Sequence, residues 1–299
     1  MKKYCVYTAI VGNYDEIRQP AAVDDDFDYL LFSDDVGEKQ VGVWKVMPIG
    51  YHNEVKTKVA RWVKTHPELL LPEYENSIWM DASVVIRDGS FYDRVKELTE
   101  QNELVSTLTH PDWTCTYQEM LHIMYLGWES ESTTLDWGHH MRKEGFPRDV
   151  GTFETRVLYR MHNEKAVKAL DELWWNCIEH YSRRDQYSFR YCLWKEKIEC
   201  HGFLPEGFDA KDNPLFVVES HSGKSINKRV GDGKKGWLMR YYYKHADEEV
   251  KIAHAVYWIY GRNNYQLWWE LMGQAFRVRH LFLRLFGKKN VYMWQLKKQ

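Results

Sequence analysis

The chain of 299 residues has few cysteines, and these form no cluster. They are Cys5, Cys115, Cys177, Cys192 and Cys200. Their number is odd and no CxxC pair occurs, which argues against a disulfide framework and against a structural zinc site. Reduced thiols in a cytosolic protein are the simplest interpretation.

The chain also lacks a long apolar run and a strong charge of either sign. No stretch is long enough to span a bilayer, and Met1-Lys2-Lys3 leads into an expected strand without a signal-peptide pattern. The formal net charge is -2, whereas nucleic-acid binders usually carry a basic excess. We therefore expect a cytoplasmic protein without a nucleic-acid partner. A protein that binds nucleic acid through its basic tail is the weakest of the alternative functions.

Short apolar runs alternate with segments of helical spacing along the first two hundred residues. Expected strands cover 4–11, 28–33, 43–49, 77–86, 104–108, 156–160 and 215–218. Expected helices cover 54–65, 91–101, 115–125, 135–143, 166–180 and 184–194. This alternation predicts an α/β fold with a Rossmann-like, mostly parallel sheet and helices on both faces. Ligands of such sheets bind beyond the carboxyl ends of the strands.

A stretch rich in Gly and Lys near residues 225–236 divides the chain into an expected catalytic domain, 1–236, and an extension, 237–299. After Glu270 the extension has no Asp or Glu, and its basic residues mingle with aromatic and aliphatic ones. This pattern predicts a basic amphipathic helix at a membrane surface, on the cytoplasmic face. The alternative is a helix that packs on the catalytic domain or forms a dimer contact.

Asp81 lies inside a strongly apolar run, Trp79-Met80-Asp81-Ala82-Ser83. An unpaired buried carboxylate is costly, so Asp81 needs a cation or hydrogen-bond donors. Mn²⁺ or Mg²⁺ held on a nucleotide diphosphate would suit its oxygen atoms. A carboxylate that merely caps the strand end is an equal alternative.

Two further features carry charge near expected element ends. Arg61 sits among apolar neighbours at i,i+3 from Lys58, and both are candidates to hold a pyrophosphate. We expect Lys56 and Lys64 on an ordinary solvated helix face. Asp185 begins an expected helix, where it either caps the helix or lies near the anomeric carbon of a sugar.

Several stretches, in this order, resemble the DUF616-type glycosyltransferase-like family. They are YTAIVGNYDEI, FDYLLFSDD, VARWVKTHPELLLPEYENSIWMDAS, HPDWTCTYQE, GTFETRVLYRMHN and SRRDQYSF. The resemblance spans roughly residues 4–194 and implies a GT-A glycosyltransferase fold. It also implies transfer of a hexosyl group from a nucleotide diphosphate sugar, with UDP expected. The implied acceptor is a saccharide or lipid-linked hydroxyl in surface polysaccharide or glycoconjugate synthesis.

A more distant resemblance, to retaining GT-A enzymes of the glycogenin and galactosyltransferase type, favours retention of stereochemistry. Arg61, LLLPEYE and Asp81 fill the places of a donor-binding Arg, a leucine-proline run and a DxD motif. Asp185-Gln186 resembles the DQ motif of that group, and His221 with Gly223-Lys224 resembles its late His-x-Gly-x-Lys-type motif. Ser83 replaces the second Asp of DxD, which weakens the expected metal site and supports the alternative of a non-catalytic carbohydrate- or nucleotide-binding module.

Together these resemblances assign a role to each candidate residue. The implied donor-binding residues are Tyr7, Ala9, Tyr14, Asp34, Asp35, Lys58, Arg61, Asp81, Ala82, Ser83, Gly151, Arg184 and Lys224. The implied catalytic residues are Asp185, Gln186 and Glu154. The implied metal ligands are Asp81, Ser83 and His221, and His110 and Tyr117 would lie near the acceptor or pocket. A structural role for His110 is an equal alternative.

Overall fold

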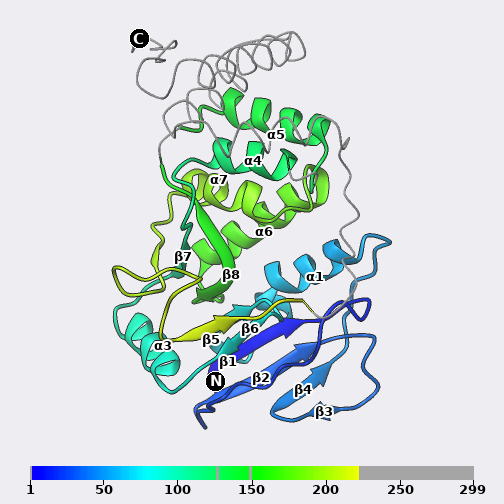
Figure 1. Ribbon diagram of the computed structural model, residues 1–299, viewed down its shortest axis with the longest axis vertical. Coiled ribbons are helices and arrows are strands. Elements are labelled where there is room, and N and C mark those ends of the chain that lie inside the picture. Colours follow the sequence, from blue (N-terminus) through cyan, green and yellow to red (C-terminus); the bar gives the residue numbers. More distant parts are fainter. Residues whose placement is uncertain (1, 126–127, 148–149, 222–299) are drawn as a thin grey trace, which may run out of the picture.

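The computed structural model describes residues 2–125, 128–147 and 150–221 (Figure 1). In this part, eight strands form one sheet in the order β3-β4-β2-β1-β5-β8-β7-β9, and β10 pairs with β6 in a second sheet. The strands are β1 Lys2–Ala9, β2 Phe27–Phe32, β3 Gln40–Val41, β4 Trp44–Met47, β5 Tyr74–Met80, β6 Val84–Ile86, β7 Val105–Thr109, β8 Phe153–Arg160, β9 His201–Gly202 and β10 Phe216–Val218. The helices are α1 Lys56–Thr65, α2 Pro67–Leu70, α3 Ser90–Glu100, α4 Thr116–Tyr125, α5 Glu131–Lys143, α6 Lys165–His180 and α7 Gln186–Glu196.

The main sheet is mostly parallel, as the sequence predicts. β4, β2, β1 and β5 run in the same direction, and β8 runs against them between β5 and β7. The carboxyl ends of β2, β1, β5 and β7 therefore meet at one edge of the sheet, and β8 begins at that same edge. Ligands of such sheets bind at this edge.

The sheet separates two hydrophobic cores because successive side chains of a strand point to opposite faces. On β1, Cys5 and Tyr7 join a core with α1, α4, α5, α6 and α7, whereas Tyr4 and Val6 join a core with α3, β6 and β10. Figure 1 shows α1, α6, α7, α4 and α5 grouped together, with α3 apart from them. The predicted placement of helices on both faces is confirmed.

The expected strand 77–86 is two strands that belong to different sheets. β5 ends at Met80, and the backbone N–H of Val84 donates to the carbonyl of Asp81 at 2.8 Å to close a turn. Val84–Ile86 then pairs antiparallel with β10. Asp81 thus stands directly beyond the carboxyl end of a central strand.

None of the helices within the described residues is both long and apolar enough to cross a membrane. The expected boundary near 225–236, the extension 237–299 and Lys224 all lie outside the described residues.

Candidate active site

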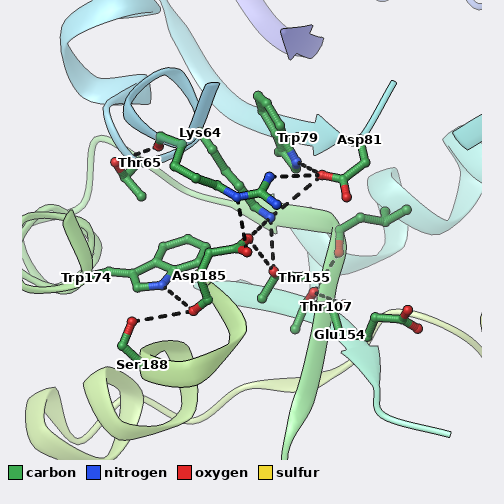
Figure 2. Close-up of polar contacts among 12 residues, drawn as sticks. Lys64, Thr65, Trp79, Asp81, Thr107, Glu154, Thr155, Trp174, Asp185 and Ser188 are labelled. Atoms are coloured by element: carbon green, nitrogen blue, oxygen red, sulfur yellow. Dashed lines mark hydrogen bonds and ion pairs between the residues drawn. The ribbon is translucent and has the colours of Figure 1, made fainter. Parts of the chain in front are cut away.

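Four charged side chains meet at the carboxyl edge of the sheet, and we call them the ion cluster: Arg61, Lys64, Asp81 and Asp185 (Figure 2). Arg61 and Lys64 share one face of α1 by their i,i+3 spacing. Asp81 follows β5, and Asp185 immediately precedes α7. Three elements, of which α7 is far from the other two in the sequence, therefore bring two cations and two carboxylates together.

Asp185 is the buried anion of the ion cluster. Its Oδ2 atom accepts hydrogen bonds from Lys64 Nζ at 2.5 Å and Thr155 Oγ1 at 2.9 Å, and its Oδ1 atom lies 3.1 Å from Arg61 Nε. Asp185 occupies the N-cap position of α7, as the helix-cap interpretation expects, but its side chain makes no capping hydrogen bond to the helix. Burial by itself raises the pKa of Asp185, but Arg61 and Lys64 outweigh burial and hold this pKa well below its usual range. Asp185 is therefore a fixed negative charge and a weak base.

Lys64 is buried, with its side chain only 1% exposed, so the expected solvated position is wrong. Its Nζ atom donates to Thr155 Oγ1 at 2.9 Å and lies 5.5 and 5.6 Å from the ring centroids of Trp79 and Trp174. Burial lowers the pKa of Lys64, and the charges of Asp185 and Asp81 oppose this effect. The ammonium is thus enclosed by two aromatic rings and the carboxylates.

A second buried ion pair, between Arg160 and Asp171, contacts the end of α1 at the backbone carbonyl of Lys64. Arg160 is fully buried and donates to Asp171 Oδ1 at 2.6 Å, to the Lys64 carbonyl at 2.6 Å and to the Tyr7 hydroxyl. The Tyr7 hydroxyl also donates to the Lys64 carbonyl, at 3.0 Å. Tyr7 is therefore a core residue with no exposed surface, and its expected contact with a nucleotide is wrong. The sequence interpretation missed Arg160 and Asp171.

Asp81 is the accessible carboxylate of the ion cluster, with its side chain 30% exposed. Its Oδ1 atom accepts a hydrogen bond from Trp79 Nε1 at 2.8 Å. The same oxygen atom lies 3.7 Å from Arg61 Nη1 and 3.8 Å from Lys64 Nζ. The cation and the hydrogen-bond donor expected for Asp81 are thus supplied by Arg61, Lys64 and Trp79 of the protein itself.

The loop after β1 carries Tyr14, whose hydroxyl is influenced by charges of the ion cluster. The charges of Arg61 and Asp81 both act on the Tyr14 hydroxyl, whose pKa is raised mainly by burial. The Tyr14 ring lies 4.8 Å from that of His221, and His221 Nδ1 is 2.6 Å from Asp15 Oδ2. His221 therefore belongs to the base of this loop.

The expected Mn²⁺ or Mg²⁺ site can be tested against these donors. His221 contacts Asp15, and Asp81 Oδ1 faces two cations within 4 Å. Ser83 is buried, and its carbonyl accepts the backbone N–H of Glu219 at 2.8 Å. No group of three His, Cys, Asp or Glu side chains is arranged for a metal ion among residues 2–125, 128–147 and 150–221. The described donor set does not fit a divalent metal.

Two of the expected donor-binding carboxylates hold loops. Asp35 Oδ2 accepts the backbone N–H groups of Gly12 and Asn13, and Asp34 Oδ1 accepts that of Ile49 at 2.9 Å. Asp35 therefore shapes the loop that ends at Tyr14, and a direct contact of either carboxylate with uridine or ribose stays a prediction.

Two other expected site residues point elsewhere. Lys58 Nζ donates to the carbonyl of Glu179 at 2.6 Å, so Lys58 is not part of the ion cluster. Tyr117 has no exposed surface and donates to the carbonyl of Phe146 at 3.1 Å. Its expected position in an acceptor pocket is therefore wrong.

Four further candidates lie at or next to the ends of strands or helices. Ala9 ends β1, Ala82 follows Asp81, and Gln186 begins α7 with its side chain partly exposed. Gly151 precedes β8 with φ +76°, and no atom lies within 4 Å of where a Cβ would stand. The backbone at Gly151 therefore leaves open space beside the start of β8.

Glu154 lies at a shift of register between β7 and β8. Thr107 pairs with Leu158, but the next residue, Leu108, pairs with Glu154. Such irregularities re-aim side chains next to functional sites. One carboxylate oxygen of Glu154 contacts Arg156, whereas the buried Oε2 has no hydrogen-bond partner. Burial raises the pKa of Glu154 and Arg156 opposes it, so Glu154 is the better proton acceptor of the two expected catalytic carboxylates.

Glu119 on α4 is a buried carboxyl that the sequence interpretation did not select, although it ends the HPDWTCTYQE stretch. Thr152 Oγ1 donates to Glu119 Oε2 at 3.0 Å, and His110 Nε2 lies 3.7 Å from Oε1. His110 Nδ1 accepts the backbone N–H groups of Asp112 and Trp113, which leaves the ring proton on Nε2, facing Glu119. Burial raises the pKa of Glu119 to about 8 and lowers that of His110 to about 4. Both groups are thus neutral at pH 7.

Because Glu119 is buried, it should make the free energy of unfolding depend on pH. Glu119→Gln should remove this contribution. Because the folded-state pKa lies above the ordinary value, Glu119 favours folding fully only below pH 4, and this contribution is lost as pH rises towards 8. Between pH 5.5 and 7, where the carboxyl of Glu119 is protonated in the folded state and ionised in the unfolded state, the free energy of unfolding of the wild type should fall, relative to Glu119→Gln, by about 1.4 kcal/mol per pH unit. Urea unfolding of both proteins measures this difference. Parallel curves would show that Glu119 is ionised in the folded state.

The match to a protein family agrees with the sequence resemblance. Residues 1–204 match the family model described as TOD1/MUCI70, glycosyltransferase-like domain. Among solved structures, the chain is similar to the apo structure of the bifunctional glycosyltransferase WbbM, at 10% identity and a TM-score of 0.40. That alignment covers 85% of this chain and 52% of WbbM, so this chain spans about half the length of that enzyme. No curated protein matches the chain. The family match extends over more than two thirds of the sequence, and the chain belongs to the TOD1/MUCI70 family of glycosyltransferase-like domains.

Proposed function

We propose that this protein transfers a hexosyl group from a nucleotide diphosphate sugar, with a UDP-sugar expected, to a saccharide or lipid-linked hydroxyl. The observation that carries the proposal is the ion cluster, in which a buried and an accessible carboxylate share two cations at the carboxyl edge of the sheet. Membership of a glycosyltransferase-like family supports it. Surface polysaccharide or glycoconjugate synthesis is the process that such an acceptor implies.

Arg184 is the cation best placed to meet the leaving diphosphate. Its guanidinium lies 5.3 Å from the ring centroid of Trp128, and its buried Nε has no hydrogen-bond partner. Its charge lowers the pKa values of both Asp185 and Glu119, so Arg184 acts electrostatically on the ion cluster. Charge-assisted hydrogen bonds from such a guanidinium would stabilise the diphosphate as the glycosidic bond breaks.

Asp185 would act on the sugar rather than on a proton. The anomeric carbon gains positive charge as its bond to the diphosphate oxygen breaks, and a carboxylate that stays ionised stabilises this charge. Gly151 leaves space beside the start of β8, and the partly exposed Gln186 follows Asp185 directly. These two residues would line the sugar position.

The stereochemical outcome decides where the acceptor proton goes. With retention, which the distant resemblance favours, the leaving diphosphate takes the proton as the acceptor oxygen bonds to the anomeric carbon. With inversion, a carboxylate must take it, and Glu154 is then the candidate because its Oε2 has no hydrogen-bond partner and its pKa is raised.

The alternative function is a non-catalytic carbohydrate- or nucleotide-binding module, which Ser83 in place of a second Asp supports. The same ion cluster would hold a nucleotide in both cases. Release of nucleoside diphosphate from a nucleotide sugar separates the two functions, since only a transferase breaks the glycosidic bond.

The expected loss for Arg184→Gln is about 10- to 150-fold in the rate of UDP release from UDP-glucose, UDP-galactose or related donors. This range corresponds to removal of a charged hydrogen bond worth about 1.5–3 kcal/mol. Arg183→Gln is the matched control, because Arg183 contributes the same charge but faces the carbonyl of Trp128. Equal rates in both variants would remove Arg184 from the site, and no release by the folded wild type from any donor would favour the binding module.

We also propose peripheral contact with the cytoplasmic face of a membrane. The basic and aromatic pattern of residues 237–299 supports this contact. A lipid-linked acceptor would be reached at that surface.

A further inference from the structure

The ammonium of Lys64 stands between the two carboxylates of the ion cluster. Its Nζ atom lies 2.5 Å from Asp185 Oδ2 and 3.8 Å from Asp81 Oδ1. A divalent ion that bridged a nucleoside diphosphate and these carboxylates would need oxygen ligands at about 2.0–2.6 Å. Oδ1 of Asp81 and both carboxylate oxygen atoms of Asp185 already lie within 4 Å of Lys64 Nζ or of a nitrogen atom of Arg61, and Figure 2 shows Lys64 beside Asp81 and Asp185.

The position of Lys64 is fixed by its surroundings. The side chain is buried, donates to Thr155 Oγ1, and packs between the rings of Trp79 and Trp174. Its backbone carbonyl accepts a hydrogen bond from Arg160 at 2.6 Å. These contacts therefore hold the ammonium at the position in the ion cluster that a metal ion would need.

The other donors expected to complete a metal site are unsuitable in this chain. Position 83 offers a serine hydroxyl, a weaker ligand than the carboxylate of a DxD motif. His221 Nδ1 contacts Asp15 instead. A divalent ion at Asp81 would have one carboxylate ligand and would meet the positive charges of Arg61 and Lys64 within 4 Å of the same oxygen atom.

We propose that Lys64 takes the place of a divalent metal, and that this site binds a nucleoside diphosphate without any metal ion. Lys64 neutralises the two carboxylates, while Arg61 and Arg184 meet the charge of the phosphates. This inference rests on the proposed function, because it concerns how the same donor site handles the diphosphate.

The first test compares binding with and without metal in the full chain. UDP and GDP are titrated calorimetrically into protein dialysed against EDTA, and again in the presence of 1 mM MnCl₂, about a saturating amount for metal-dependent sites of ordinary affinity. We expect at least one of the two nucleotides to bind, and we expect its Kd in EDTA and its Kd with MnCl₂ to agree within about threefold. Binding that needs Mn²⁺, or that Mn²⁺ tightens more than about tenfold, overturns this inference and leaves the proposed function standing. No binding of either nucleotide to the folded protein overturns both.

The second test exchanges the ammonium for an apolar chain of similar length. Lys64→Met should lose binding in EDTA by about tenfold or more and regain part of it with Mn²⁺, since the two carboxylates are then free to hold a metal. Lys56→Met, an exposed position at the start of α1, is the control and should bind as the wild type does. EDTA-resistant binding by Lys64→Met at wild-type affinity overturns the inference. If this variant does not fold, the wild-type comparison decides.

Discussion

Asp185→Asn is expected to lower the transfer rate by about 10²- to 10³-fold, the range found when a preorganised electrostatic stabiliser is removed. The amide keeps the shape of the side chain but removes the charge that would face the anomeric carbon. UDP release from the preferred donor measures the effect. Asp136→Asn, an exposed position on α5, is the control. A folded Asp185→Asn protein that retains more than a tenth of the wild-type rate would contradict a role in catalysis.

The same variant should also be less stable, because it leaves the buried Lys64 and the partly buried Arg61 without their principal counter-charge. Breaking a buried ion pair by removing one partner costs about 3–5 kcal/mol, and urea unfolding at pH 7 measures this cost. Since the folded-state pKa of Asp185 is depressed, its contribution is present above about pH 4 and is lost as pH falls towards that lower pKa. The stability difference between wild type and variant should therefore shrink below pH 4. A difference that stays constant with pH would show that the charge is not its cause.

Arg160→Met is expected to lower the free energy of unfolding by about 3–5 kcal/mol. The substitution leaves Asp171 buried without its partner and removes a donor from the Lys64 carbonyl. Burial already raises the pKa of Asp171 to about 7 against the opposing charge of Arg160, so this carboxyl should become protonated in the variant. Urea unfolding at pH 7 gives the stability.

The double variant Arg160→Met/Asp171→Leu is the control for this mechanism. Replacing both members of a buried ion pair with apolar residues is often neutral, so the second substitution should restore most of the lost stability. A single variant that loses less than 1 kcal/mol, or a double variant less stable than the single one, would contradict the role given to this pair.

The order of the elements follows from hydrophobic periodicity, but the direction of β8 does not. A buried strand has the same apolar pattern in either direction, so the sequence predicts a strand at 156–160 without showing that it runs against β5. The split at Asp81 was equally hidden, because Val84–Ile86 is as apolar as the strand before it and pairs with a segment more than a hundred residues away.

Candidate site residues were predictable where a charge contradicts its local pattern. Asp81 interrupts an apolar strand, and Arg61 lies in an apolar stretch, so both stood out. Lys64 did not stand out, because it is buried by Trp174 and Asp185, which lie more than a hundred residues away in the sequence. The spacing of residues within α1 does not indicate such contacts. Glu119 was missed for the same reason: its burial comes from the start of β8 rather than from its own helix.

For two tyrosines the error was the opposite: the sequence predicted ligand-binding residues where the structure has core residues. Tyr7 and Tyr117 carry a polar atom that can face either a ligand or a buried carbonyl group, and sequence alone does not distinguish the two. In the structure both donate to carbonyl groups inside the core.

The central claim, that the ion cluster holds a nucleotide diphosphate sugar, is tested most directly by thermal shift. A panel of nucleotide sugars is screened in EDTA against the full-length wild type and Arg184→Gln. A donor at a hundredfold excess over its Kd stabilises the fold by about 2.7 kcal/mol. We predict that one donor raises the Tm of the wild type and raises that of Arg184→Gln clearly less. A folded wild type whose Tm responds to no nucleotide sugar, with or without Mn²⁺, would contradict the claim.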